Sequence, residues 1–168
     1  MIVTRPETDA DHDAVRIVNE RAFEGPVEAA LVDRLRAVCP DALSIVAEVK
    51  GDVVGHILFT PVTIAGRDTG AAGLAPMAVL PEHQRRGIGA ALVGSGLEAL
   101  RARGCPLVVV LGHPAYYPRF GFRPASELGL RCQWEGVPDG VFMAMRLDDT
   151  ADAGTGVARY HGAFDASA

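Results

Sequence analysis

Residues 84–90 read Gln-Arg-Arg-Gly-Ile-Gly-Ala and are the most informative stretch of this chain. An apolar run ends just before them at Val79, and a segment rich in alanine and leucine follows. A strand, a glycine turn and a helix start together predict unpaired backbone N–H groups at the positive end of a helix dipole, an arrangement that binds a pyrophosphate. The two arginines add full positive charges. The alternative for such a glycine pair is a turn that only packs a helix closely on a strand.

Two common nucleotide-binding loops do not fit residues 84–90. A Walker loop requires Gly-Lys followed by Ser or Thr after its glycines, and the sequence has no such triplet here. A dinucleotide fingerprint requires G-x-G-x-x-G after the first strand of the fold, with an acidic residue about 20 positions further on. Neither pattern is met.

The residues around this stretch predict a β-α-β unit. An apolar strand over 71–79 precedes the loop, a helix over 88–103 follows it, and a continuous apolar strand over 107–111 comes next. The two strands are expected to be parallel, with a right-handed connection. Pro76 lies inside the first of them, so we expect an edge or a bulge that interrupts the hydrogen-bond ladder just before the loop.

The N-terminal half has the pattern of an antiparallel sheet with two helices. Cap residues and helical spacing predict helices over 8–23 and 27–38, separated by Gly25-Pro26. β-branched runs separated by short glycine turns predict a hairpin and a further strand. The predicted strands lie, in order, around Val3 and over 43–49, 53–64, 71–79, 107–111 and 141–147. We therefore expect an α/β fold built on a mixed (α+β) sheet, mostly antiparallel in its N-terminal half and completed by the parallel unit.

Composition favours a soluble globular enzyme with one domain over 1–168, in which about 148–168 form a C-terminal tail packed on the domain. The chain has 49% hydrophobic residues and a net charge of -5, which disfavours sequence-independent binding to nucleic acid. No apolar segment approaches the ~18 residues of a membrane span, and the first residues lack the apolar core of a signal peptide. The expectation is a cytoplasmic monomer or homodimer.

Cysteine and histidine spacing predicts neither a disulfide framework nor a metal site. The three cysteines, Cys39, Cys105 and Cys132, are odd in number and form no C-x-x-C pair. The five histidines are scattered, with no pair at i and i+4 on a helix. We interpret the thiols as buried or incidental and the histidines as structural or solvated.

Residues 84–90 resemble the acetyl-CoA loop of the GCN5-related N-acetyltransferases, whose pattern Gln/Arg-x-x-Gly-x-Gly/Ala is met by Gln84, Gly87 and Gly89. Residues 111–122, Leu-Gly-His-Pro-Ala-Tyr-Tyr-Pro-Arg-Phe-Gly-Phe, are similar to the segment after the fifth strand of that family. A proline with two tyrosines there resembles the YhbS-like bacterial branch, as does the closing stretch 156–164. The resemblance extends from Arg5 to Phe164, with specific motifs confined to 73–90 and 111–122.

The resemblance implies the acyl-CoA N-acyltransferase fold, acetyl-CoA as co-substrate, and an acceptor that is a primary amine of a small molecule or protein. In this family the strand before the loop supplies N–H groups to the developing oxyanion, and a splayed strand, here opened by Pro76, pairs with pantetheine. The implied cofactor-binding residues are Met77, Ala78, Val79, Gln84, Arg85, Arg86, Gly87, Ile88, Gly89 and Ala90. The alternative is a non-catalytic acyl-CoA-binding module that senses CoA status.

Two residues are the main candidates for proton transfer. Tyr117 matches the tyrosine that gives a proton to the leaving thiolate in this family, and a phenol with an ordinary pKa near 10 can do so; Tyr116 is expected to pack. The strand 71–79 lacks the carboxylate or histidine that family members often use as a base, so Glu28 is our candidate for acceptor binding or proton removal. The alternative for Glu28 is a solvated acid at a helix N-terminus. Glu82 and His83, close to the loop, are further candidates for which a surface role is expected.

Overall fold

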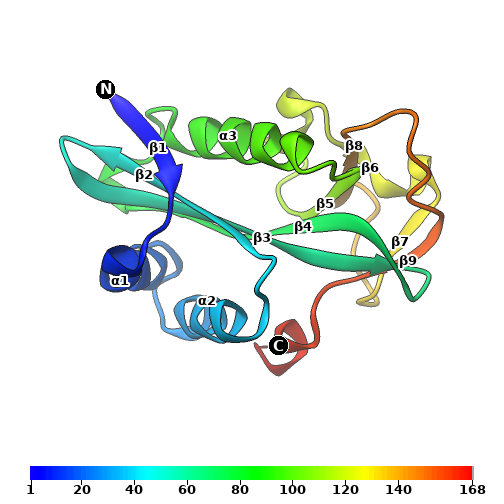
Figure 1. Cartoon of the computed structure of the whole chain (residues 1–168), viewed down its shortest axis with the longest axis horizontal. Coiled ribbons are helices and arrows are strands. Elements are labelled where there is room, and N and C mark those ends of the chain that lie inside the picture. The colour runs from blue at the N-terminus through cyan, green and yellow to red at the C-terminus, as the bar shows by residue number, and fades with distance from the viewer. Residues whose placement is uncertain (168) are drawn as a thin grey trace. The chain divides into compact units, whose positions relative to one another are not determined.

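The computed structural model describes residues 1–167, which form two compact units (Figure 1). The first unit comprises residues 1–59, 75–96 and the segment from 162, and the second comprises 60–74 and 97–161. Strands β3 and β4 and helix α3 contribute residues to both. The single domain expected from the sequence stays a prediction.

Three α-helices and several short 3-10 helices are interspersed among the strands along the described chain. The helices are α1 (His12–Phe23), α2 (Val27–Val38) and α3 (Ile88–Ala102), with short 3-10 helices at Asp9–Asp11, Pro81–His83, Tyr117–Phe120, Ala125–Leu128 and Gly162–Ser167. The strands are β1 (Ile2–Pro6), β2 (Leu43–Val49), β3 (Asp52–Ile64), β4 (Arg67–Val79), β5 (Leu107–Leu111), β6 (Arg123–Pro124), β7 (Leu130–Cys132), β8 (Phe142–Arg146) and β9 (Gly156–Arg159).

In the first unit, β1, β2 and β3 form an antiparallel sheet with Ile2 opposite Val49 and Leu43 opposite Phe59. Lys50 and Gly51 join β2 to β3 with φ of 53° and 83°, the two left-handed residues of a tight hairpin turn. Helices α1 and α2 cover one face of this sheet and the first half of α3 the other (Figure 1). An apolar core lies under α1 and α2 and is formed by Val15, Leu31, Val32, Leu35, Cys39, Val46 and Leu58.

Helix α3 lies close to β3 because two glycines leave room for it. A Cβ on Gly55 would lie 2.9 Å from the side chain of Ile88, and a Cβ on Gly96 would lie 2.2 Å from the ring of Phe59. Carbon atoms pack at about 3.5–4.0 Å, so any larger residue at either position would push the helix off the sheet. The start of α3, and with it residues 84–90, is therefore placed by direct contact with β3.

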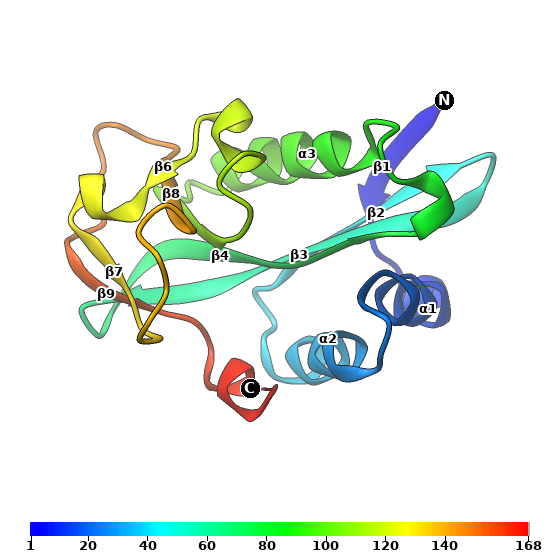
Figure 2. The same cartoon turned by 180° about the vertical axis from the view of Figure 1, so that it is seen from behind.

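In the second unit, β4 pairs in parallel with β5 over Ala72–Leu74 and Val108–Val110, which confirms the predicted parallel unit. Strand β8 lies antiparallel to β5 and to β6. Strand β9 pairs antiparallel with Thr63 and Ile64 of β3 and parallel with β7, and Figure 2 shows β7 and β9 side by side.

The structure differs from the sequence prediction at three places. Ala65 and Gly66 make a two-residue turn with φ of 52° and 76°, so β4 begins at Arg67 rather than at 71. The sequence pattern predicted no strand between 111 and 141, whereas the structure has two short ones there, β6 and β7. The strand over 141–147 is not the last, since β9 lies inside the expected tail. These strands have two to four residues, too few to show a period of two, and their pairing is decided by tertiary neighbours.

Candidate functional site

The backbone of residues 84–90 forms a loop with alternating conformations before α3. Gln84 is extended (φ -68°, ψ 157°), whereas Arg85 and Gly87 have φ of 62° and 85°. The carbonyl of Gly87 accepts the N–H of Ala91 at 3.0 Å, so Gly87 caps the helix. The N–H groups of Ile88, Gly89 and Ala90 lie in the first turn, where no intrahelical acceptor exists. The loop thus presents consecutive donors at the positive end of the α3 dipole.

Arg85 has a left-handed backbone conformation, which is energetically unfavourable for a residue other than glycine. A non-glycine residue in that conformation is disfavoured by about 1–2 kcal/mol, and such residues concentrate at functional sites. Gly87 has no atom within 4 Å of its missing side chain, so the positive φ, rather than crowding, is what requires glycine there. The glycine turn predicted from the sequence is therefore present, and Arg85 shares its conformation.

Three contacts hold the loop in place within the first unit. Ile88 is buried against Gly55 of β3. The Gln84 amide donates from Nε2 to the carbonyl of Val79 at 3.1 Å, which ties the loop to the end of β4. Just before the loop, the two guanidinium nitrogens of Arg21 donate to the two carboxylate oxygens of Glu82 at 2.7 and 2.8 Å. Gln84, predicted as a cofactor contact, thus has a positioning contact of its own.

The loop carries two positive charges that no described residue neutralises. Arg85 and Arg86 are exposed, and neither makes an ion pair or hydrogen bond with a residue described in the structure. The nearest acid along the chain, Glu82, is already engaged by Arg21, and this hydrogen bond lowers the pKa of the Glu82 carboxyl. Glu82 is therefore a stable anion in a paired state, which argues against its role as a base.

The last residues of β4 precede this loop. Ala78 is buried, Met77 and Val79 are half-buried, and the N–H of Leu80 donates to the carbonyl of Val54 at 2.9 Å. The parallel ladder between β4 and β5 ends at Leu74, two residues before Pro76. An interruption at this point is what the missing N–H of proline predicts.

Tyr117 lies in the second unit at the start of a 3-10 helix, and its ring is buried. Tyr116 and Phe122 meet it edge-to-face at centroid distances of 5.1 and 5.7 Å. A Cβ on Gly112 would lie 2.3 Å from Cε2 of the ring, so the ring packs directly against the backbone of this glycine. The hydroxyl of Tyr117 makes no hydrogen bond with a described residue. Burial, and then the neighbouring Tyr116, raise the pKa of Tyr117 to about 12, so the phenol is protonated at neutral pH.

Tyr116 has the packing role expected from the sequence. Its ring is half-buried, and the guanidinium carbon of Arg119 lies 4.5 Å from its centroid. Arg119 also donates from Nε to the carbonyl of Tyr116 at 2.8 Å. These contacts brace the turn that carries Tyr117.

Glu28 lies in the first turn of α2 and is half-buried. It makes no hydrogen bond or ion pair with a residue described in the structure. Glu28, the loop and Met77–Val79 belong to the first unit, whereas Tyr117 belongs to the second. The role of Glu28 stays a prediction.

The sequence did not indicate two residues that position the candidate site. Gly112 directly precedes the His-Pro-Ala-Tyr-Tyr motif, and a glycine beside a bulky aromatic is the signal that could have identified it. Arg21 lies 61 residues from Glu82, and no local pattern connects the two. Only the packing of α1 beside the short helix Pro81–His83 pairs these residues.

Among the described residues, no group of histidine, cysteine, aspartate and glutamate side chains is arranged to hold a metal ion. The three cysteines are free, and Cys39 and Cys105 are buried, as expected. Within the described part of the chain, every helix is too short or too polar to span a membrane.

Comparison with known proteins gives consistent matches. The family model described as an acetyltransferase (GNAT) domain matches residues 3–125. The uncharacterized N-acetyltransferase YhbS of Escherichia coli K12 is 37% identical over 166 residues, which are 98% of this chain and 99% of YhbS. The uncharacterized N-acetyltransferase YjhQ of the same strain is 45% identical over 122 residues, 70% of this chain and 67% of YjhQ.

Two solved structures are similar over almost the whole chain. YhbS from Escherichia coli in complex with CoA has a TM-score of 0.91 and 37% identity, covering 98% of this chain and 92% of that one. A GNAT family acetyltransferase from Brucella melitensis in complex with acetyl-CoA has a TM-score of 0.82 and 37% identity, covering 98% and 99%. Sequence, fold and loop agree: this chain belongs to the GNAT family of N-acetyltransferases.

Proposed function

We propose that this protein transfers the acetyl group of acetyl-CoA to a primary amine of a small molecule or of a protein. The observation that carries the proposal is the loop 84–90, in which a left-handed Arg85 and Gly87 precede a helix start with free N–H donors. The CoA and acetyl-CoA bound to the Escherichia coli and Brucella melitensis relatives support the choice of co-substrate.

In this proposal the pyrophosphate of acetyl-CoA is held by backbone donors of residues 86–90 and by the guanidinium groups of Arg85 and Arg86. Guanidinium groups form short, charge-assisted hydrogen bonds with phosphate oxygens. Gln84 acts indirectly by holding the loop to Val79. Met77, Ala78 and Val79 supply backbone groups for the pantetheine arm and for the oxyanion.

The chemistry is a direct attack. The lone pair of the neutral amine forms a bond to the thioester carbonyl carbon, and the C–S bond then breaks to leave an amide and a CoA thiolate. The attacking nitrogen loses one proton to a base or to water, and the sulfur gains one proton from an acid. The products are the acetylated amine and free CoA, with no net change in protons.

Tyr117 is the proposed acid. Its pKa of about 12 keeps it protonated, so that it can donate, but makes it a weaker acid than a thiol in water, whose pKa is near 8.5. Donation is therefore favourable only if the leaving thiolate is also desolvated, because burial raises the proton affinity of a thiolate as it does that of a phenolate. After each turnover, solvent returns the proton to the phenolate.

Glu28 is the proposed group for acceptor binding or proton removal. A carboxylate with no partner among the described residues can accept the hydrogen bond of an ammonium group or take its proton through water. Residues 71–79 contain no carboxylate or histidine, which favours a base on another element.

The test is thiol release from acetyl-CoA with a panel of diamines, amino acids and peptides, each compared with its already acetylated form. We expect amine-dependent release of CoA and formation of the acetylated amine, identified by mass spectrometry. Gly89→Val is the binding-deficient control, because its side chain would enter the space of the pyrophosphate. Acetyl-CoA binding without release for any amine would instead support an acyl-CoA-binding module, and normal binding by a folded Gly89→Val protein would refute the role of the loop.

A further inference from the structure

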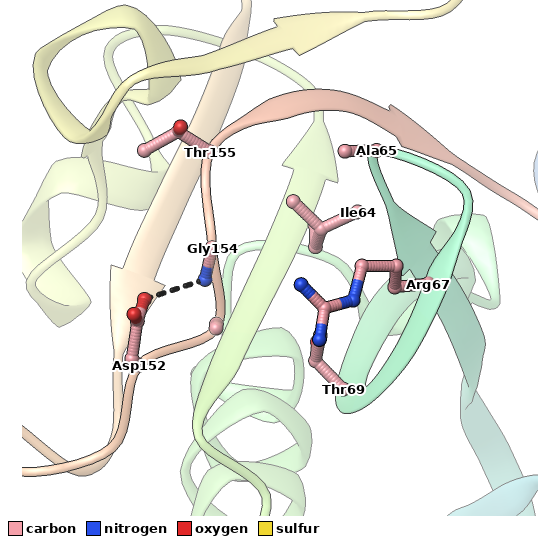
Figure 3. Close-up of a pocket in the computed structure, with 8 residues that line it drawn as sticks. Ile64, Ala65, Arg67, Thr69, Asp152, Gly154 and Thr155 are labelled. Carbon is pink, nitrogen blue, oxygen red and sulfur yellow. Dashed lines mark hydrogen bonds between the residues drawn. The ribbon is translucent and has the colours of Figure 1, made fainter.

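The second unit contains a pocket of about 350 Å³. One wall is the end of β3, the turn after it and the start of β4, with Ile64, Arg67 and Thr69 (Figure 3). The other wall is the segment 152–155, which leads into β9. Pockets that hold small molecules begin at about 300 Å³, so this one suits a small ligand. The acetyl-CoA loop belongs to the other unit.

Backbone contacts fix both walls. The N–H of Ala65 in the turn donates to the carbonyl of Val157 in β9 at 2.9 Å. A Cβ on Gly156, whose φ is 123°, would lie 3.1 Å from the Cβ of Ala65, so the strand and the turn are in close contact. On the far wall, Oδ1 of Asp152 accepts the N–H of Gly154 at 2.8 Å and holds the segment in a turn. The pocket is therefore a defined feature of the fold.

Two residues of opposite charge line this pocket without pairing with each other. The guanidinium of Arg67 extends toward the segment 152–155, while Asp152 lies on that segment (Figure 3). No ion pair joins them, and neither has another charged partner among the described residues. Beside Arg67, the hydroxyl oxygen of Thr69 is buried without a hydrogen-bond partner.

We propose that this pocket binds a small zwitterion that carries a carboxylate and an ammonium group, as an amino acid does. The carboxylate would pair with the planar fork of Arg67, the arrangement for which guanidinium is best suited. The ammonium group would pair with the free Oδ2 of Asp152. A simple anion would be repelled by Asp152 and a simple cation by Arg67, so only a ligand with both charges satisfies both walls.

The test uses the full chain, isotope-labelled for amide NMR and titrated with glycine, β-alanine and γ-aminobutyrate, in which the two charges lie progressively further apart. Acetate and methylammonium are the single-charge controls. We expect saturable binding of at least one zwitterion, with the shifts centred on the amides of Gly154 and Thr155. Arg67→Gln and Asp152→Asn should each weaken that binding by at least about tenfold, the loss of one charged hydrogen bond.

Arg131→Gln and Asp149→Asn are matched controls, because both residues are exposed in the same unit and do not line the pocket. They should change the affinity by less than about twofold, and acetyl-CoA binding should be unchanged in all four variants. The proposal is overturned if no zwitterion binds with a Kd below about 10 mM. It is equally overturned if acetate binds as tightly as the zwitterions, if the shifts lie elsewhere, or if Arg67→Gln and Asp152→Asn bind like the wild type.

Discussion

Replacing Gly112 by alanine should displace the ring of Tyr117 without touching the acetyl-CoA loop. The added Cβ would lie 2.3, 2.9 and 3.3 Å from Cε2, Cδ2 and Cζ of that ring. Since carbon atoms pack at about 3.5 Å or more, the ring must retreat by at least about 1.2 Å. Gly112 is not among the positive-φ glycines of the described residues, so alanine fits its backbone and the clash is the main effect.

The expected loss follows from this displacement. A misplacement of about 1 Å at a reacting group can lower the rate about 100-fold, so kcat should fall by roughly that factor if Tyr117 is the acid. Tyr116 and Phe122 crowd the ring on other sides, so overpacking should also lower the free energy of unfolding by about 1–3 kcal/mol. The affinity for acetyl-CoA should stay at the wild-type value.

The assay is steady-state thiol release with saturating acetyl-CoA, together with calorimetric binding and thermal unfolding. Gly140→Ala is the matched control, because its Cβ would meet only Pro114 at 3.9 Å, an ordinary contact in the same unit. In a Tyr117→Phe background, Gly112→Ala should lower kcat no further, since both changes remove one function. A folded Gly112→Ala enzyme with kcat within about twofold of wild type, or losses that multiply in the double variant, would refute the reasoning.

Four further predictions follow from the same structure. Tyr117→Phe should lower kcat by about 10²- to 10⁴-fold at unchanged acetyl-CoA affinity, and a wild-type kcat would assign the acid elsewhere. Glu28→Gln should raise the KM of the amine or flatten the acidic limb of the pH profile of kcat/KM. If instead only the free energy of unfolding changes, by under about 1 kcal/mol, Glu28 acts as a charge at the helix terminus. Burial holds the pKa of His56 at about 4 against 6.5 when unfolded, so the free energy of unfolding should fall by about 2 kcal/mol from pH 7.5 to 5, and urea denaturation of His56→Gln should show a flatter dependence. Glu82→Gln should raise the KM of acetyl-CoA by less than about tenfold at low salt and less at high salt, and an Arg21→Glu, Glu82→Arg double variant should restore it; a KM unchanged at low salt would show that the pair does not position the loop.

The pH prediction has a specific structural cause. His56 is fully buried under α1, where Nδ1 lies 3.2 Å from Nδ2 of Asn19 and Nε2 lies 2.9 Å from Oγ of Ser44. Asn19 also donates to the carbonyl of Val15, which fixes its amide and leaves Nδ1 of the ring as the acceptor. The folded state therefore holds neutral His56, while the unfolded state takes up a proton as the pH falls from 6.5 toward 4. The contribution of neutral His56 to the free energy of unfolding is therefore present above about pH 6.5 and is lost as the pH falls from there toward 4.

Much of the fold could be predicted from the sequence because its signals are local. Helix α2 was predicted over the range that the structure gives. Its signals are local, because Gly25-Pro26 precede its start and apolar residues recur at helical spacing along it. The parallel pairing of β4 and β5 follows from the strand, helix and strand order alone. The glycine loop was also predictable, because a left-handed turn before a helix requires glycine wherever it occurs.

Tertiary structure alone decided which side chains the candidate site uses and how they are held. Arg21 neutralises Glu82, and Gln84 is tied to Val79, through contacts that no sequence pattern encodes. The position of the Tyr117 ring depends on the space left by Gly112, and the pocket beside Arg67 exists only because β9 pairs with the end of β3. Local propensity acts over one turn of helix or one hairpin, so it sets elements and loops, whereas side-chain partners tens of residues apart are chosen by packing. The sequence by itself therefore determined the family, the longer strands and the loop. The folded chain determined which charges are paired, how the Tyr117 phenol is buried and where the pocket beside Arg67 lies.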